Sequence, residues 1–242
     1  ALKKNIRHHI NTIYIVSRDE EDIREFCKKN GYIFVDEVSV LGYGKEKIHY
    51  NWNGLDRRGW TLQQLLKLSG DKIAKCDDYI VVDSDTMLIN NHSFIVDDRY
   101  VFFENEEWNE SYFKAYKRIF GYSPNNRLSF TSHMMIFNRQ MLSEMKQEME
   151  HLHGKPWDEV YLGAVDVRDM SSISDYDTYA NWMWHNHPEK VLRLPFYNKS
   201  VSRMYLDDAR VLHNKFGDIY KSLSYHGYFQ KDLKSVVGEI NV

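Results

Sequence analysis

The stretch Asp78-Tyr79-Ile80-Val81-Val82-Asp83-Ser84-Asp85-Thr86-Met87-Leu88 decides how the rest of the sequence is interpreted. The apolar, partly β-branched run from Tyr79 to Val82 is typical of a buried strand. Two aspartates at positions i and i+2 follow it, and apolar residues resume directly afterwards. A simple surface turn would bring Gly, Asn or Pro at this point. The stretch therefore predicts a strand that ends with Asp83 and Asp85 held at the edge of the core.

Strand and helix patterns alternate on both sides of this stretch. A β-branched run at 12–17, a helically spaced segment at 18–30 that Gly31 ends, and a second run at 32–35 predict a βαβ unit. Further patterns indicate strands at 100–104, 129–138, 191–197 and 209–213, and helices beginning at Thr61 and covering 110–120, 139–153 and 171–187. The alternation predicts an α/β fold with a central, mostly parallel sheet flanked by helices.

Size and composition limit the class of protein. A chain of 242 residues with 43% hydrophobic residues suits one globular domain, and we expect a single catalytic domain over residues 1–242. The 32 basic and 35 acidic residues give a formal charge of -3, which leaves no electrostatic footprint for nucleic acid. The apolar runs are too short for a transmembrane segment.

The cysteines and the first residues bear on cellular context. Cys27 and Cys76 form neither a metal-site spacing nor a disulfide framework, which fits a reducing compartment. We therefore expect a cytoplasmic domain, whose attachment to the inner face of a membrane would come through regions outside this chain. Because Leu2 to Asn11 reads like the end of a helix, we also expect a segment of a longer protein, with a first strand missing or upstream.

The position of the two aspartates points to a metal site. Open α/β sheets bind ligands outside the carboxyl ends of their strands, where Asp83 and Asp85 are expected. Carboxylates suit Mg²⁺ or Mn²⁺, which complete their coordination with phosphates and water. A D-x-D by itself also occurs in solvated turns, so the spacing alone leaves both interpretations open.

The strand followed by Asp83-Ser84-Asp85 resembles the D-x-D element of glycosyltransferases with the GT-A fold, which is related to the Rossmann fold. Other segments resemble, in order, signatures of a bacterial family of putative GT-A glycosyltransferases known mainly as a domain of unknown function: Arg58-Gly59-Trp60 with Gln63-Gln64, Ser132-His133-Met134-Met135, and Ser174-Asp175-Tyr176-Asp177-Thr178-Tyr179. Together they cover roughly residues 10–230.

The resemblance implies transfer of a sugar from a nucleotide-diphosphate sugar, a UDP-sugar first, to a hydroxyl of a saccharide or glycan acceptor, as in polysaccharide biosynthesis. Mn²⁺ or Mg²⁺ would offset the charge on the leaving diphosphate. On this interpretation Asp85 binds the metal directly. Asp83 contacts either the ribose of the donor or, through a water molecule, the metal. A histidine near the C-terminus often completes the metal site, and His226 is preferred to His213.

The general base is expected at the start of the helix over 171–187. A carboxylate there, beside the donor, can take the proton of an acceptor hydroxyl, and Asp175 and Asp177 are the candidates. Asp175 resembles the acidic position at the start of the catalytic helix in inverting enzymes, so inversion is favoured. Ser174 or Asp175 acting only as an N-cap is the structural alternative.

Donor contacts are predicted in three places. Ser17 ends the first strand near the expected nucleotide pocket, and Arg58 or its neighbour Arg57 has the guanidinium that phosphate oxygens favour. Both arginines are equally compatible with solvated loop charges. Gln63 and Gln64 project about 100° apart on a helix, so only one of them faces the cleft, and Gln63 is the predicted donor contact.

Two other classes of function remain open. A metal-dependent nucleotidyltransferase or phosphohydrolase would use the same carboxylates, although neither G-x-x-x-x-G-K-[ST] nor G-x-G-x-x-G is present. An inactive glycan-binding module would use the 17 Tyr and 6 Trp as stacking surfaces. Ser132 and His133 do not indicate a hydrolase, because neighbours on a strand point to opposite faces. They are interpreted as a sugar contact or as strand packing.

Overall fold

The N-terminal part of the chain is a βαβ unit. The computed structural model describes residues 1–106, 108–124 and 127–226, with the backbone alone at 206–209. After α1 (Leu2–Asn5), strand β1 (Tyr14–Ser17) pairs in parallel with β2 (Ile33–Asp36) across helix α2 (Glu21–Asn30). Gly31 ends α2 with a φ of 67°, a conformation that glycine adopts without steric cost. The βαβ opening that the sequence predicts is therefore confirmed.

The middle of the chain carries the strands around the two aspartates. Helix α3 (Glu37–Leu41), the hairpin β3 (Asn51–Trp52) and β4 (Leu55–Asp56), and helix α4 (Arg58–Lys67) come first. They are followed by β5 (Asp78–Val82), β6 (Thr86–Leu88), β7 (Ile95–Val96), β8 (Arg99–Glu104) and helix α5 (Glu110–Phe120). Helix α4 begins three residues earlier than predicted, because the Asp56 side chain accepts a bond from the Arg58 backbone N–H.

The C-terminal half is mainly helical. It contains β9 (Met134–Asn138), α6 (Arg139–His153), α7 (Trp157–Gly163), α8 (Asp175–Asn186), β10 (Val191–Pro195), β11 (Asn198–Ser202), α9 (Ala209–Phe216) and β12 (Ser222–His226). The strand predicted at 209–213 is wrong, since these residues belong to α9. Leu212 and Phe216, four residues apart, are both buried on one side of that helix, so the pattern has the helical period.

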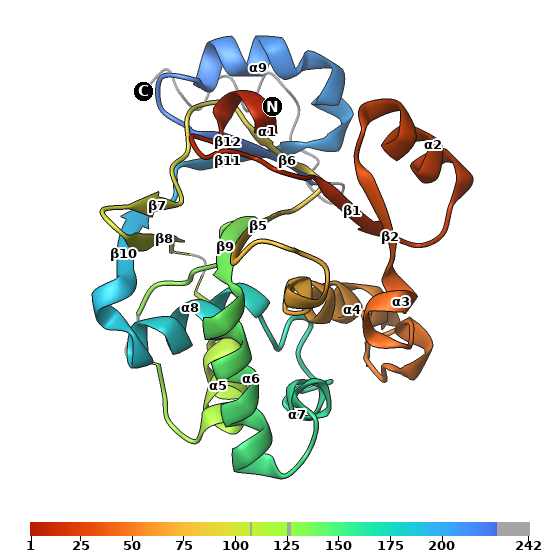
Figure 1. The fold of residues 1–242 in the computed structure, drawn as a ribbon, viewed down its shortest axis with the longest axis vertical. Coiled ribbons are helices and arrows are strands. Elements are labelled where there is room, and N and C mark those ends of the chain that lie inside the picture. Colours follow the sequence, from red (N-terminus) through yellow and green to blue (C-terminus); the bar gives the residue numbers. More distant parts are fainter. Residues whose placement is uncertain (107, 125–126, 227–242) are drawn as a thin grey trace.

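The chain is of the mixed α/β class, as predicted, with its strands in several small sheets. Parallel pairs are β1–β2, β8–β10 and β11–β12, and antiparallel pairs are β3–β4, β5–β9, β6–β12 and β7–β8. Figure 1 shows β5 and β9 in the middle of the molecule, with α5, α6 and α8 on one side and β6, β11, β12 and α9 on the other.

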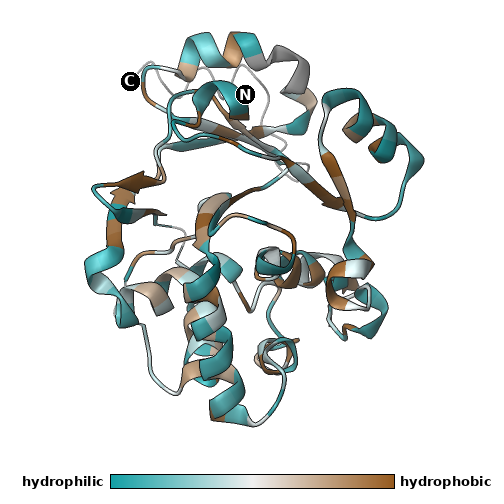
Figure 2. Cartoon of the chain, in the orientation of Figure 1, coloured by the Kyte–Doolittle hydropathy of each residue, from teal (hydrophilic) through white to brown (hydrophobic). Residues whose placement is uncertain are grey.

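Two hydrophobic clusters support these layers. The larger includes Leu65 of α4, Phe137 of β9, Leu142 of α6 and Tyr179 of α8, all fully or almost fully buried. The smaller joins residues of β11, α9 and β12, among them Val201, Leu212 and Leu223. Apolar colour marks β1, β2 and β10, while the outer helices such as α2 are mainly hydrophilic (Figure 2). Among the described residues, no helix has the length and apolar character needed to cross a membrane.

Candidate active site

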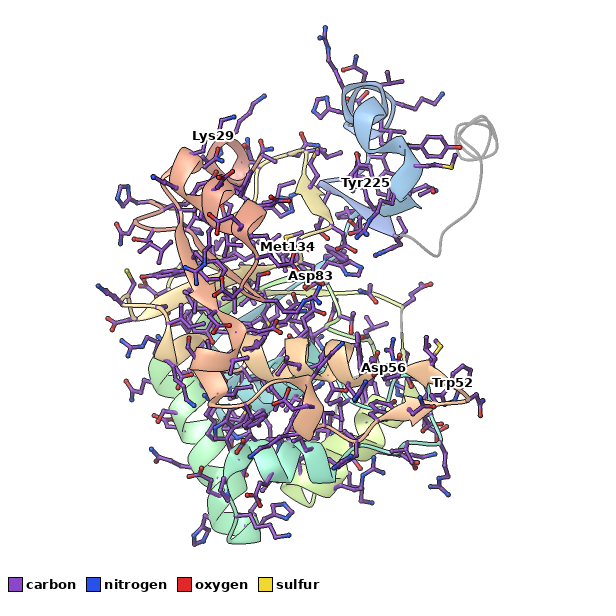
Figure 3. The ribbon with its side chains drawn as sticks, turned by 90° about the vertical axis from the view of Figure 1, so that its right-hand side faces the viewer. Lys29, Trp52, Asp56, Asp83, Met134 and Tyr225 are labelled. Carbon is purple, nitrogen blue, oxygen red and sulfur yellow. The ribbon has the colours of Figure 1, made fainter. Side chains whose placement is uncertain are left out.

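The site is built where β5 ends. Val82 of β5 lies opposite Met134 of β9, and beyond this pair the Asp83 backbone N–H donates to the His133 carbonyl at 2.9 Å. The strand pairing therefore continues one residue past β5 and fixes the position of the Asp83 backbone, from which the carboxylate projects. Figure 3 shows Asp83 beside Met134 in the interior of the molecule.

Asp83 is almost enclosed by polar partners. Its Oδ1 lies 2.6 Å from the Lys67 ammonium and accepts a bond from the Tyr176 hydroxyl at 3.2 Å, and its Oδ2 lies 3.4 Å from His133 Nδ1. Burial acts to raise the pKa of Asp83, but Lys67 and His133 outweigh it and hold that pKa at about 2. Asp83 is thus a permanently charged carboxylate.

Lys67, the last residue of α4, links two carboxylates. Its side chain is only 9% exposed, and its ammonium lies 3.6 Å from Asp175 as well as 2.6 Å from Asp83. The ammonium also lies 4.2 Å from the centre of the Tyr176 ring, a cation–π contact. Burial acts to lower the pKa of Lys67, but the two carboxylates outweigh burial and raise it. Lys67 is therefore a buried cation with two anionic neighbours.

Asp175 opens helix α8 and is buried. Its backbone N–H donates to the Gln64 side-chain oxygen at 2.8 Å, which fixes the helix start against α4. In the described part of the chain, no hydrogen bond is made to its Oδ2, the oxygen that faces Lys67. Burial raises the pKa of Asp175 to about 7, although Lys67 acts in the opposite direction. A carboxyl with such a pKa suits proton transfer near neutral pH.

Asp177 is engaged quite differently from Asp175. Its carboxylate accepts bonds from the Ser129 hydroxyl at 2.8 Å, the Phe130 N–H at 2.8 Å and the Thr131 hydroxyl at 3.0 Å. Its backbone N–H donates to the N-cap side chain of Ser174 at 3.1 Å. Asp177 therefore ties α8 to the segment before β9, and its carboxylate is saturated with donors.

Asp85 and His226 meet from distant parts of the sequence. Strand β12 pairs with β6, and the Tyr225 N–H donates to the Asp85 carbonyl at 2.8 Å. This pairing places His226 Nδ1 3.4 Å from Asp85 Oδ2. The hydrogen bond from His226 is the main cause of a lowered pKa at Asp85. Asp85 keeps 27% of its side chain exposed, so it faces outward beside the enclosed Asp83.

The His133 ring lies between the two aspartates. Its backbone is left-handed, with a φ of 56°, which is uncommon for residues other than glycine. The ring centre of His133 lies 5.2 Å from that of His226, and His133 Nδ1 faces Asp83. The left-handed backbone conformation of His133 thus occurs at a residue whose ring lies in the candidate site.

The donor groups match a hard divalent cation in kind. The Asp85 carboxylate is of the kind that Mn²⁺ and Mg²⁺ prefer, His226 places an imidazole nitrogen beside it, and Asp83 lies two residues away. Within the described residues, no three His, Cys, Asp or Glu side chains already stand in a metal-binding arrangement. The two Asp83 oxygens are directed at Lys67 and His133, whereas His226 is paired with Asp85. His213 lies on α9, where its exposed side chain makes no bond to the described site residues.

The predicted donor contacts are spread more widely. Ser17 ends β1, and its hydroxyl donates to the Arg18 carbonyl. Arg58 forms a bidentate pair with Asp56 at the surface, at 2.9 and 2.8 Å. Gln63 is exposed, whereas Gln64 is buried against the site. Each donor role stays a prediction, and Gln64 is the glutamine that the fold brings to Asp175.

Sequence reasoning missed Lys67 and Tyr176. A usable signal was present, since Thr61, Gln64 and Lys67 recur every three residues and form a polar row on the buried side of α4. Polar side chains on the buried face of a helix are costly unless they have partners, which makes them site candidates.

Comparisons with known proteins add the family. The model of a family described as "Family of unknown function (DUF6492)" matches residues 2–233, and the chain belongs to this family. No curated protein matches the chain. Among solved structures, the chain is similar to the apo form of mouse xyloside xylosyltransferase 1, with 14% identity, a TM-score of 0.46, and coverage of 91% of this chain and 86% of that one.

Proposed function

We propose that this chain is a metal-dependent glycosyltransferase that moves a sugar from a nucleotide-diphosphate sugar to a hydroxyl of a saccharide acceptor. The observation that carries the proposal is the division of the site into two acidic centres across buried Lys67. One centre, Asp83 with Asp85, follows β5, and the other, Asp175, opens α8. Transfer needs both a group that manages the leaving diphosphate and a separate base for the acceptor.

The first centre would hold the donor. Asp85 and His226 would bind Mn²⁺ or Mg²⁺, with Asp83 beside them. When bound, the metal supplies Lewis-acid stabilisation of the departing diphosphate. Lys67 keeps Asp83 charged and in place, and the Ser17 end of β1 is proposed to line the nucleotide pocket.

The second centre would act on the acceptor. The Asp175 carboxylate takes the proton from the acceptor hydroxyl. At the same time, the oxygen of that hydroxyl forms a bond to the anomeric carbon of the donor sugar. The bond from that carbon to the diphosphate oxygen breaks, and the electron pair leaves with the nucleoside diphosphate. Attack from the side opposite the leaving group inverts the anomeric centre.

The class of reaction is tested by supplying the purified chain with sugar nucleotides and, separately, with nucleoside triphosphates, each with and without Mn²⁺. We expect metal-dependent release of a nucleoside diphosphate from one sugar nucleotide. We also expect that nucleoside diphosphate to raise the melting temperature only when Mn²⁺ is present. Consumption of triphosphates alone would show a nucleotidyltransferase or phosphohydrolase instead. Glycan binding without turnover of any donor would show a binding module.

The two helix-start carboxylates are distinguished by Asp175→Asn and Asp177→Asn. Asp175→Asn is expected to lower kcat by about 100-fold or more, since it removes the base, with little loss of stability. Asp177→Asn is expected to lower the free energy of unfolding by about 1–3 kcal/mol, because an amide cannot accept all three bonds. Urea unfolding and initial rates measure both effects. The opposite pattern would make Asp177 the base.

A further inference from the structure

Arg57, the residue before α4, is a half-buried cation to which no carboxylate of the described residues is paired. Its Nη2 donates to the Ser171 hydroxyl at 3.0 Å, and its guanidinium lies 4.2 Å from the centre of the Trp60 ring. Its buried Nε has no acceptor anywhere in residues 1–106, 108–124 and 127–226. Over the same described ranges, no carboxylate lies within ion-pair distance of Arg57.

Other arginines in this part of the fold are neutralised. Arg58 is held by Asp56 through two bonds of 2.9 and 2.8 Å, and Arg168 is held by Asp166 through two bonds of 2.9 and 2.6 Å. Both of these pairs are at the surface, where water solvates a charged side chain and little free energy is lost without a partner. Arg57 is more buried than either and, among the described residues, has no such pair. A partly buried charge without a counter-ion is unfavourable, and a bound anion would offset its cost.

The groups nearest Arg57 are neutral. Burial is the main influence on the pKa of Arg57 and lowers it, while the Tyr50 and Tyr112 phenols act in the opposite direction. Those phenols stay protonated at neutral pH, because burial also raises the pKa of both, that of Tyr112 to about 12. They therefore do not supply the negative charge that Arg57 lacks.

The position of Arg57 relates it to the proposed acceptor side. Ser171 binds Arg57 through its hydroxyl and accepts a bond from Asn109 Nδ2 at 3.0 Å through its carbonyl. Ser171 lies four residues before Asp175, and the charges of Asp175 and Asp177 both act on the Tyr112 phenol. Arg57 is thus anchored to the segment that leads directly into the proposed base. Figure 3 shows the neighbouring Asp56 nearer the edge of the molecule than Asp83.

We propose that Arg57 is an oxyanion-binding position for a phosphate or carboxylate substituent of the acceptor. The planar guanidinium is suited to hold such a group through paired N–H bonds. Trp60 and Ser171 hold the guanidinium from the protein side. The description of the ligand as an acceptor rests on the proposed transferase function, whereas oxyanion binding at Arg57 does not.

The direct test observes the Arg57 Nε–H signal by NMR on the unaltered chain during titration with inorganic phosphate, with EDTA and no donor present. The signal is assigned with Arg57→Lys, which removes it. We expect a saturable shift of this signal. A signal that stays in place up to the highest phosphate concentration overturns the proposal. Because neither metal nor donor is present, this outcome is independent of whether the chain transfers sugar.

A matched pair of variants gives a second test. Calorimetric titration with phosphate is compared for the unaltered chain, Arg57→Gln and Arg168→Gln. We expect Arg57→Gln to bind phosphate at least about 10-fold more weakly, and Arg168→Gln to bind it as the unaltered chain does, since Asp166 already neutralises Arg168. Unchanged binding in Arg57→Gln, or an equal loss in both variants, overturns the proposal.

The source of the anion is then separated with three sugars that share the same ring and differ at C6. Glucose 6-phosphate, glucuronate and neutral glucose are each titrated into the unaltered chain and into Arg57→Gln. A phosphate-bearing or carboxylate-bearing sugar whose binding weakens in Arg57→Gln identifies the substituent. Binding of glucose alone, unaffected by the substitution, counts against an oxyanion position.

Discussion

At the scale of single residues, Lys67 matters most, because it stands between carboxylates of two different elements. Its distances to Asp83 and Asp175 are 2.6 and 3.6 Å, and all three side chains are largely buried. Without the ammonium, Asp83 would lose its nearest cation, and the pKa of Asp175, which Lys67 acts to lower, would rise further. The enclosed position of Asp83 therefore depends on Lys67, which was not among the expected site residues.

Replacing Lys67 tests this dependence. We expect Lys67→Met to lower the free energy of unfolding by about 3–5 kcal/mol, because it leaves buried carboxylates without their cation. Lys114→Met is the control, since Lys114 pairs with Glu110 at the surface with 60% of its side chain exposed, and it should cost less than about 0.5 kcal/mol. Urea unfolding measures both.

The partner in this interaction is checked by a double variant. Adding Asp175→Asn to Lys67→Met removes the buried carboxyl that Lys67 faced and should restore part of the lost stability. If the effects of the two substitutions simply add, Lys67 and Asp175 do not interact, and the account of the buried cation is incorrect.

At the scale of elements, most helices and strands could be predicted from local patterns. The boundaries of α5 and α6 agree with the prediction, since each has a regular apolar face and an Asn N-cap, Asn109 and Asn138. The run 209–213 was predicted as a strand because five residues are too few to distinguish the two periods. Leu212 and Phe216 show the helical period only when the longer segment is considered.

The site was only partly predictable for a different reason. Asp83, Asp85 and Asp175 are site candidates that motifs mark in the sequence. Lys67 was missed because the polar row on α4 marks it only as a candidate, and its partners depend on how α4 packs against α8 and β5. The Asp177 carboxylate likewise accepts hydrogen bonds from Ser129, Phe130 and Thr131. No pattern in the sequence shows that these three residues lie next to α8.

The contact between the short 3-10 segment at Gly70–Lys72 and β5 gives a prediction at this scale. A Cβ on Gly70 would lie 2.2 Å from the Tyr79 ring, so Gly70→Ala should displace β5 and cost about 1–3 kcal/mol. Gly163→Ala is the control, because a Cβ there meets nothing within 4 Å and alanine favours the helix. Thermal unfolding of the two variants compares them, and equal melting temperatures would contradict the tight contact.

At the scale of the whole molecule, His92 joins the N-terminal segment to the strands. Its backbone N–H donates to Asn5 and its carbonyl accepts from Arg7, at 2.7 and 2.9 Å. Its ring is almost fully buried, stacks on Phe94 and contacts the Asn90 carbonyl through Nδ1. Burial lowers the pKa of His92 below the reference value of 6.5, despite the opposing effect of Asn90.

The pH dependence of folding follows from this shift. The unfolded chain takes up a proton at His92 at a higher pH than the folded chain does, so the stability that neutral His92 contributes is lost as pH falls below 6.5. We expect His92→Gln to be less stable at pH 7.5 but to lose less stability between pH 7 and pH 5. The exposed His151→Gln should keep the slope of the unaltered chain. Identical slopes in all three proteins would show that His92 does not control this dependence.

The pairing of β12 with β6 also has a consequence for the order of synthesis. His226 is made long after Asp85, and at about 5–20 residues per second the interval is on the order of 10 s. The described partners of Asp83, which are Lys67, His133 and Tyr176, are all made before His226. During translation, the surroundings of Asp83 can therefore form before Asp85 meets His226.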